Sequence, residues 1–279
     1  MAIGFIGTGS MGRTLIQSFI HADKLAPEEI VVHNRTRNKA EELARNYPGL
    51  RVAADNRELV RQSSLFFLCV KPGEFRHVLE EIQDCVRSDQ IAISITSPVM
   101  IRDLEEWLPA KVAKIIPSIT QAVHAGHSLF IPGERLHATD REILWNLFSA
   151  ISRPLVIEED HVRIASDLAS CSPAFLAHLL EKLADAAVEE TNISREQALA
   201  LVTQMTDGLG RLLTEGGFTL KSLQERVAVP GGITRKGLDL LDTGVGSVFH
   251  DLIRLTHAKY AEDVQQVKTA LLTEKERNH

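Results

Sequence analysis

Three closely spaced glycines near the start of the chain restrict its fold more than any other feature. They lie directly after the short apolar run Ile3–Ile6 and before a helical pattern that includes Leu15 and Phe19. In such a strand–turn–helix context, the first glycine makes the tight turn, the second admits a pyrophosphate, and the third packs helix against strand. The helix N-terminus adds free amides for an anion. A glycine turn can also serve packing alone, but the combined context favours dinucleotide binding. The six residues of the turn are Gly7, Thr8, Gly9, Ser10, Met11 and Gly12.

The first 160 residues alternate short apolar runs with segments of helical spacing. This alternation is typical of a parallel sheet covered by helices on both faces. A last pair of strands, Ser128–Ile131 and Pro154–Ile157, flanks a predicted helix over Asp140–Ala150. We therefore predict an α/β Rossmann-type dinucleotide-binding domain over residues 1–160. The earlier predicted strands are Ile3–Ile6, Ile30–His33, Leu65–Val70, Ile91–Ile95 and Val112–Ile116.

The remaining residues, 161–279, predict an all-α domain. Apolar residues keep helical spacing over Phe175–Ala187, Ala198–Leu213 and Val248–Ala258. Ser194, followed three residues later by Gln197, matches a capping box for the second of these helices. The first two helices are apolar on more than one face, which favours burial of part of their surface in a partner subunit. We expect a dimerisation domain.

Composition excludes several classes of protein. The 279 residues are 44% hydrophobic and carry a net charge of −6, without the basic footprint of a nucleic-acid-binding protein. No apolar run approaches the roughly 20 residues of a membrane span, and no signal-peptide pattern opens the chain, so we expect a cytoplasmic protein without a membrane partner. The three cysteines and eleven histidines show no metal-ligand spacing, and we predict no metal site.

The residues after the second predicted strand bear on the choice of dinucleotide. An NAD site usually places an acid there to bind the ribose 2′-hydroxyl. This chain instead has Asn34, Arg35, Thr36 and Arg37, which can bind a 2′-phosphate through charge-assisted hydrogen bonds. The arginines could also simply solvate the start of a helix. We predict NADPH as the cofactor, with NADH as the alternative.

Several motifs together resemble the pyrroline-5-carboxylate reductase family, which reduces a cyclic imine to proline with NAD(P)H. The resemblance runs nearly from end to end, and its most specific part is the Pro-Gly-Gly-x-Thr segment. The motifs are GFIGTGSMG, Asp55-Asn56, Val70-Lys71-Pro72, Ser172-Pro173-Ala174-Phe175, Arg195-Glu196-Gln197-Ala198 and Val229-Pro230-Gly231-Gly232-Ile233-Thr234.

The resemblance implies roles for residues in both predicted domains. Asn56 would contact the adenosine, and the loop Val70, Lys71 and Pro72 would lie beneath the nicotinamide. The helical domain would interlock with a second subunit, giving a homodimer and leaving a higher oligomer open. The substrate would be held by Pro230, Gly231, Gly232 and Thr234.

The segment around Gly231 and Gly232 suits a small ring that carries one carboxylate. Backbone amides at a helix N-terminus bind a carboxylate, and glycines permit close approach. The Thr234 hydroxyl could orient the ring nitrogen or donate a proton to it, and we take Thr234 as the candidate catalytic residue. Alternatively, Thr234 is the N-cap of a helix over Arg235–Leu241. Lys71, which precedes a proline, is given no chemical role.

Departures from the family pattern gather on the substrate side. Val229 stands where the family usually has Ser, and Thr219-Leu220 replaces a His-Pro pair. Three other segments also differ, at Ser97-Pro98, Pro117–Thr120 and Ala169–Pro173. The main interpretation is a reductase of pyrroline-5-carboxylate or a related substrate. The alternative is a divergent paralogue, similar to the late-competence members of this family, that binds NADP(H) and dimerises but has another substrate or a regulatory role.

Overall fold

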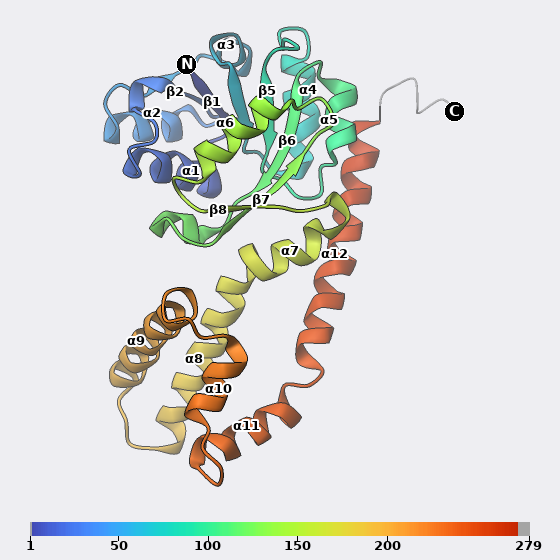
Figure 1. Cartoon of the computed structure of the whole chain (residues 1–279). Coiled ribbons are helices and arrows are strands. Elements are labelled where there is room, and N and C mark those ends of the chain that lie inside the picture. The colour runs from blue at the N-terminus through green and yellow to red at the C-terminus, as the bar shows by residue number, and fades with distance from the viewer. Residues whose placement is uncertain (1, 273–279) are drawn as a thin grey trace. The chain divides into compact units, whose positions relative to one another are not determined.

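The computed structural model describes residues 2–272 and divides them into two compact units (Figure 1). The first, here called the sheet unit, comprises 2–171 and 255–272. The second, the helical unit, is Ser172–Arg254. These units differ from the predicted split at residue 160, because the chain returns to the sheet unit at its C-terminal end. No described helix has both the length and the apolar character needed to cross a membrane.

The sheet has eight strands in the order β3-β2-β1-β4-β5-β6-β7-β8. All neighbouring pairs are parallel except β6 and β7, which are antiparallel. The order reverses between β1 and β4, where doubly wound folds bind their ligands. All seven predicted strands are confirmed, whereas the short strand β3 was not predicted. The strands are β1 (Ile3–Ile6), β2 (Ile30–His33), β3 (Arg51–Val52), β4 (Leu65–Leu68), β5 (Ile91–Ser94), β6 (Lys111–Ile116), β7 (His127–Pro132) and β8 (Arg153–Val156).

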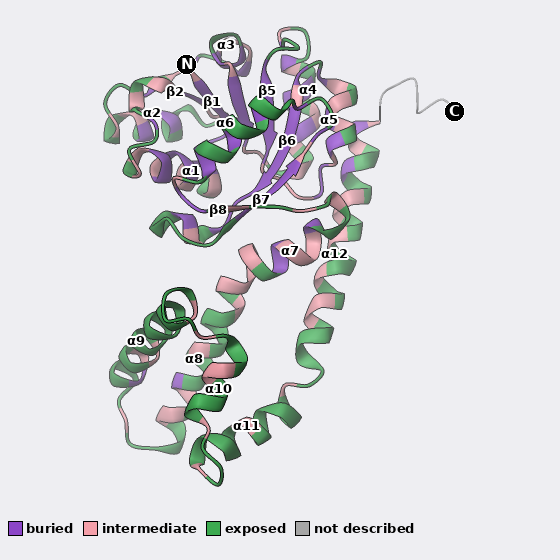
Figure 2. Cartoon of the chain, viewed as in Figure 1, coloured by how far each residue is buried: buried purple, intermediate pink, exposed green. Residues whose placement is uncertain are grey.

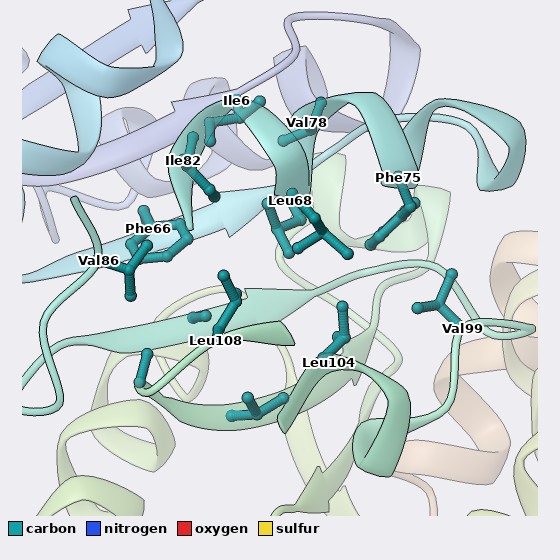
Figure 3. Packing of buried hydrophobic residues seen from close by; sticks show 14 of the residues in the cluster. Ile6, Phe66, Leu68, Phe75, Val78, Ile82, Val86, Val99, Leu104 and Leu108 are labelled. Atoms are coloured by element: carbon teal, nitrogen blue, oxygen red, sulfur yellow. The ribbon is translucent and has the colours of Figure 1, made fainter. Parts of the chain in front are cut away.

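Helices cover both faces of this sheet and create two apolar cores. Successive residues of a strand point to opposite faces. Phe66 and Leu68 of β4 accordingly lie in one core, which Figure 3 shows, while Leu65 and Phe67 lie in the other. The helices are α1 (Ser10–His21), α2 (Arg37–Asn46), α3 (Asn56–Gln62), α4 (Phe75–Ile82), α5 (Ile101–Trp107), α6 (Ala138–Phe148) and α7 (Val162–Ser166).

The helical unit buries little apolar surface of its own (Figure 2). Within 172–254, Ala184 and Ala198 are the hydrophobic residues that are buried. The predicted capping box is confirmed, since the Ser194 hydroxyl accepts a hydrogen bond from the amide of Gln197. Thr219 caps the next helix in the same way. The helices are α8 (Ser172–Glu190), α9 (Arg195–Thr214), α10 (Leu220–Val227), α11 (Ile233–Gly244) and the start of α12 (Val248–Leu271).

The second part of α12 packs on the sheet unit. The Tyr260 hydroxyl donates to the Ser97 carbonyl at 3.2 Å, and the Trp107 indole donates to the Leu271 carbonyl at 3.2 Å. Arg76 donates to two more carbonyls at the end of this helix. The last carbonyls of a helix have no partner within the helix, so these side chains cap it. This capping fixes the C-terminal part of the helix to the sheet unit.

Candidate functional site

The three glycines of the first turn differ in the atoms that an added Cβ would meet. Gly7 has φ +99°, and a Cβ there would lie 2.5 Å from the Cys69 carbonyl oxygen. A Cβ on Gly12 would lie 2.5 Å from the carbonyl oxygen of Gly7. Gly9, by contrast, faces open space, because a Cβ added there would meet no atom within 4 Å. The first and third glycines are therefore required by the fold, while the second leaves room for a ligand.

The N-terminus of α1 is open to an anion. Its N-cap is Gly9, no side chain caps it, and its first turn contains no acid. The amides of this turn and the positive end of the helix dipole are thus available to a phosphate. The amide of Thr8 is not, because it donates to Asn34 Oδ1 at 3.0 Å. The Thr8 side chain is buried, so this residue shapes the turn, and its contact with a cofactor stays a prediction.

A hollow of about 270 Å³ lies at the carboxyl ends of β1, β2 and β4, and we call it the β2-side hollow. Asn56 contributes to its lining but has its polar atoms engaged. Asn56 Nδ2 donates to Glu81 Oε2 at 2.7 Å, and Asn56 Oδ1 lies 2.6 Å from His33 Nδ1. This arrangement makes His33 Nδ1 the donor and orients its ring, which also lines the hollow. The adenosine contact of Asn56 remains a prediction.

The loop after β2 brings cationic and hydroxyl groups to the same hollow. Arg35, Thr36 and Lys39 all line it. Arg37 instead pairs with Glu41 on its own helix, at 2.8 Å. Sequence reasoning missed Lys39, although its position three residues after Thr36 places it one helical turn further along α2.

A second hollow, here called the β5-side hollow, lies at the carboxyl ends of β1, β4, β5 and β6 and has a volume of about 400 Å³. Val70 and Lys71 line both hollows, so the two share one wall. The Thr96 hydroxyl donates to the Val70 carbonyl at 3.1 Å, which fixes that wall to the loop after β5. Burial raises the pKa of the Cys69 thiol, which keeps it neutral. Apart from Lys71, Thr96 and the open N-terminus of α1, this hollow is lined mostly by apolar groups.

Eleven of the thirteen predicted cofactor residues line one or both hollows. Thr8 and Pro72 line neither. The residues brought together are Gly7, Gly9, Ser10, Met11, Gly12, Asn34, Arg35, Thr36, Asn56, Val70 and Lys71.

A buried ion pair supports the loop after β5. Lys114 of β6 has no exposed surface, and its Nζ lies 2.5 Å from Glu159 Oε1 and 3.1 Å from the Ser97 carbonyl. Burial lowers the pKa of Lys114 against the opposing attraction of Glu159. Lys114 and Tyr260 therefore hold the same carbonyl, next to Thr96 of the β5-side hollow. No group of three or more His, Cys, Asp and Glu residues suited to a metal occurs among residues 2–272.

The loop after β6 is tied to the segment that leads into α8. Pro173 has no N–H to donate to the Ala169 carbonyl, and the chain forms a π-helical turn over Asp167–Cys171. The Ser118 hydroxyl donates to that carbonyl at 2.8 Å, and the Ser170 hydroxyl donates to the Pro117 carbonyl at 2.8 Å. Two of the segments that depart from the family pattern thus hold each other in place.

The predicted substrate segment lies in the helical unit and is largely exposed. Gly231 has φ +73°, and Gly232, not Thr234, is the N-cap of α11. The N-cap interpretation of Thr234 is therefore wrong, because the helix begins at Ile233 and Thr234 is its second residue. No side chain caps this helix, and its first turn contains no acid. Val229 packs over the turn, since a Cβ on Gly232 would lie 2.8 Å from Val229 Cγ2.

Comparisons with known proteins cover both ends of the chain. Residues 2–98 match the family "NADP oxidoreductase coenzyme F420-dependent", and residues 159–263 match "Pyrroline-5-carboxylate reductase dimerisation". ComE operon protein 4 of Bacillus subtilis is 41% identical, over 96% of this chain and 98% of the relative. Pyrroline-5-carboxylate reductase 3 of the same organism is 32% identical, over 95% and 97%. A solved pyrroline-5-carboxylate reductase from Coxiella burnetii has a TM-score of 0.80 at 25% identity, over 97% and 98%.

Proposed function

The chain belongs to the pyrroline-5-carboxylate reductase family, and on that premise we propose that it is an NADPH-dependent reductase of a cyclic imine. The proposed reaction converts the carbon–nitrogen double bond of pyrroline-5-carboxylate into the amine of proline. The observation that carries this proposal is the groove formed by the two hollows, which meet at the open N-terminus of α1.

The β2-side hollow suits the adenosine half of NADPH. Arg35, Thr36 and Lys39 line this hollow and would offer a 2′-phosphate the donors and the positive charge that it needs. No acid follows β2 at the position that favours a ribose 2′-hydroxyl. The match of residues 2–98 to a family of NADP oxidoreductases supports the same choice, with NADH as the alternative.

The β5-side hollow suits the nicotinamide half, which supplies the hydride when it is bound. The mostly apolar wall formed by Val70, Ile95 and Ile116 would exclude water from the reacting face. The amides of Ser10, Met11 and Gly12 would hold the pyrophosphate between the two halves. These residues position the cofactor, and positioning carries much of the catalysis in such a reaction.

The segment Pro230–Thr234 is the proposed substrate site. Pro230 fixes the turn, and Gly231 and Gly232 leave the amides of α11 accessible to a carboxylate. Thr234, in the first turn of that helix, would hydrogen-bond the ring nitrogen as it becomes an amine. Catalysis by this chain thus rests on Thr234 and on positioning.

We also propose that the protein forms a homodimer through its helical unit, with a higher oligomer left open. The match of residues 159–263 to a dimerisation family supports this assembly. The exposed leucines of α8 and α9 give it a physical basis, because a second copy would remove them from water. The cytoplasmic location stays a prediction, as does the absence of nucleic-acid and membrane partners.

A second function has its own support. The relative with 41% identity is named for an operon rather than for a reaction. In addition, Val229 and Ser97-Pro98 of this chain depart from the family pattern on the substrate side. The second candidate is an NADP(H)-binding homodimer with another substrate or with a regulatory role.

Steady-state kinetics separate the two functions. Purified protein should oxidise NADPH in the presence of pyrroline-5-carboxylate, and the loss of the cofactor's near-ultraviolet absorbance monitors this reaction. Thr234→Ala should lower kcat about 10²-fold. Thr234→Ser keeps the hydroxyl and should retain most of the activity. NADPH binding without oxidation by the wild-type protein would exclude the first function and favour the second.

A further inference from the structure

An ion pair spans the rim of the β2-side hollow. Arg35, from the loop after β2, places its Nη1 2.6 Å from Oε1 of Glu74, from the turn after β4. Both residues line the hollow. The Arg35 side chain is 80% exposed and that of Glu74 is 36% exposed, so both are within reach of a ligand.

The stability of the fold explains the acid of this pair only in small part, because Glu74 is the N-cap residue of α4 but its side chain caps no amide of that helix. Exposed ion pairs such as this one also add little to the stability of a fold. The other acid that lines the hollow, Glu81, is used by the fold, because its two oxygens accept from the amide and the side chain of Asn56. Glu74 makes its ion pair with a residue that we assign to the 2′-phosphate of the cofactor.

The chemistry of a phosphate makes this pairing consequential. A phosphate monoester carries a charge of about −1.5 to −2 near pH 7. The guanidinium presents five donors in a rigid fork, so Arg35 can bind a phosphate while one nitrogen still faces Glu74. A phosphate held by that guanidinium must then lie within a few ångströms of a carboxylate, and like charges at such distances repel. A cofactor without the 2′-phosphate escapes this repulsion.

We propose that Glu74 is a specificity-determining residue that weakens the preference for NADPH over NADH by competing for Arg35. This inference rests on the proposed function, because it takes Arg35, Thr36 and Lys39 as the 2′-phosphate site. It gives the chain a cofactor preference that is set by the balance between one acid and the cations around it. Lys39, on α2, supplies the second positive charge.

The test is the affinity of Glu74→Gln for each dinucleotide, measured by the fluorescence of the bound nicotinamide. We expect NADPH to bind about three- to tenfold more tightly than to the wild-type protein, and NADH to change by less than about twofold. The NADPH affinity of this variant should also fall more steeply with added salt, because its site is more positive. Glu41→Gln, which removes the partner of Arg37 outside the hollow, is the matched control and should change neither affinity.

A double variant shows whether the effect acts at Arg35. In the Arg35→Ala background, Glu74→Gln should raise the logarithm of the NADPH affinity by less than half as much as it does in the wild-type protein. Unchanged or weaker NADPH binding by Glu74→Gln would overturn the inference. Tight NADPH binding without oxidation of the cofactor contradicts the proposed reaction alone, and failure of the wild-type protein to bind either dinucleotide contradicts both proposals.

Discussion

The two proposed binding surfaces differ in how completely one chain builds them. The groove at the carboxyl ends of the strands is formed by loops that follow five strands, and Gly7, Gly12, Asn34 and Asn56 are fixed by contacts within the sheet unit. The segment Pro230–Thr234 stands on a helical unit with little core, and Ile233 within it is 93% exposed.

This difference follows from the kind of layer on which each site stands. A parallel sheet buries both faces, so its loops begin from rigid positions. A pair of helices with apolar residues on more than one face lacks the surface to bury them. We therefore expect the groove to bind its cofactor as a property of one chain, and the substrate segment to depend on assembly.

The largest effect is expected where the sheet unit buries a charge. Lys114→Ala should lower the free energy of unfolding by about 3 kcal/mol, because it removes the buried partner of Glu159. Urea denaturation measures this change. Arg211→Ala, which removes an exposed ion pair with Glu215 in the helical unit, is the control and should cost less than about 0.5 kcal/mol. Equal effects would remove the contrast between the two units.

The same lysine makes stability depend on pH in a defined direction. Burial lowers the pKa of Lys114 below its unfolded value of about 10.4. Between these two values the unfolded chain binds more protons, so the free energy of unfolding rises with pH. The difference in stability between the wild-type protein and Lys114→Met should therefore shift in favour of the wild type as the pH is raised toward about 10. A shift in the opposite direction would contradict the lowered pKa.

The assembly of the helical unit gives the next effect. Leu183 of α8 is 57% exposed in one chain, and Leu183→Glu should weaken the dimer about 100-fold by placing a charge in the interface. Light scattering should then report a mass near 30.9 kDa at low micromolar concentration. Ile143→Glu alters an equally apolar residue of the sheet unit, 44% exposed, and should leave the mass unchanged. Dissociation by both variants would place the interface elsewhere.

Substitutions at the glycines of the groove should affect either the stability of the fold or the affinity for the cofactor. Gly7→Ala should lower the free energy of unfolding by about 2 kcal/mol, because its φ is positive and its Cβ would meet a carbonyl. Gly9→Ala should leave stability unchanged and weaken NADPH about tenfold, since its methyl group would occupy the open side. Gly73→Ala, at another open position, should change neither. Thermal denaturation and cofactor fluorescence measure the two quantities.

The smallest effect concerns the choice between the two dinucleotides. Arg35→Ala should weaken NADPH about tenfold and NADH less than about twofold, since it removes one charge-assisted contact to the 2′-phosphate. Arg37→Ala is the control, because its guanidinium pairs with Glu41 on the same helix. Equal losses for both dinucleotides in Arg35→Ala would remove the assignment of the 2′-phosphate site.

Much of the sheet unit could be predicted because its signals are local. Apolar runs located the strands to within one or two residues, with β3 missed because Arg51-Val52 is too short and too exposed to give such a run. The antiparallel pairing of β6 and β7 could not be predicted from the sequence, because the apolar pattern of a strand does not depend on its direction. The N-cap of α11 was misplaced because Thr is a good N-cap, while the backbone gives that position to Gly232.

The strand–turn–helix of Gly7–Gly12 is specified locally, because φ/ψ preference and side-chain volume act between near neighbours. Which charges meet, by contrast, depends on how the whole chain folds. Arg35 and Glu74 are 39 residues apart in sequence, and Lys114 and Glu159 are 45 apart. Such pairs depend on strand order and on the loops that leave each strand, which no local pattern encodes. The groove can thus be predicted from the sequence, whereas the charge balance at its rim arises only when the chain folds.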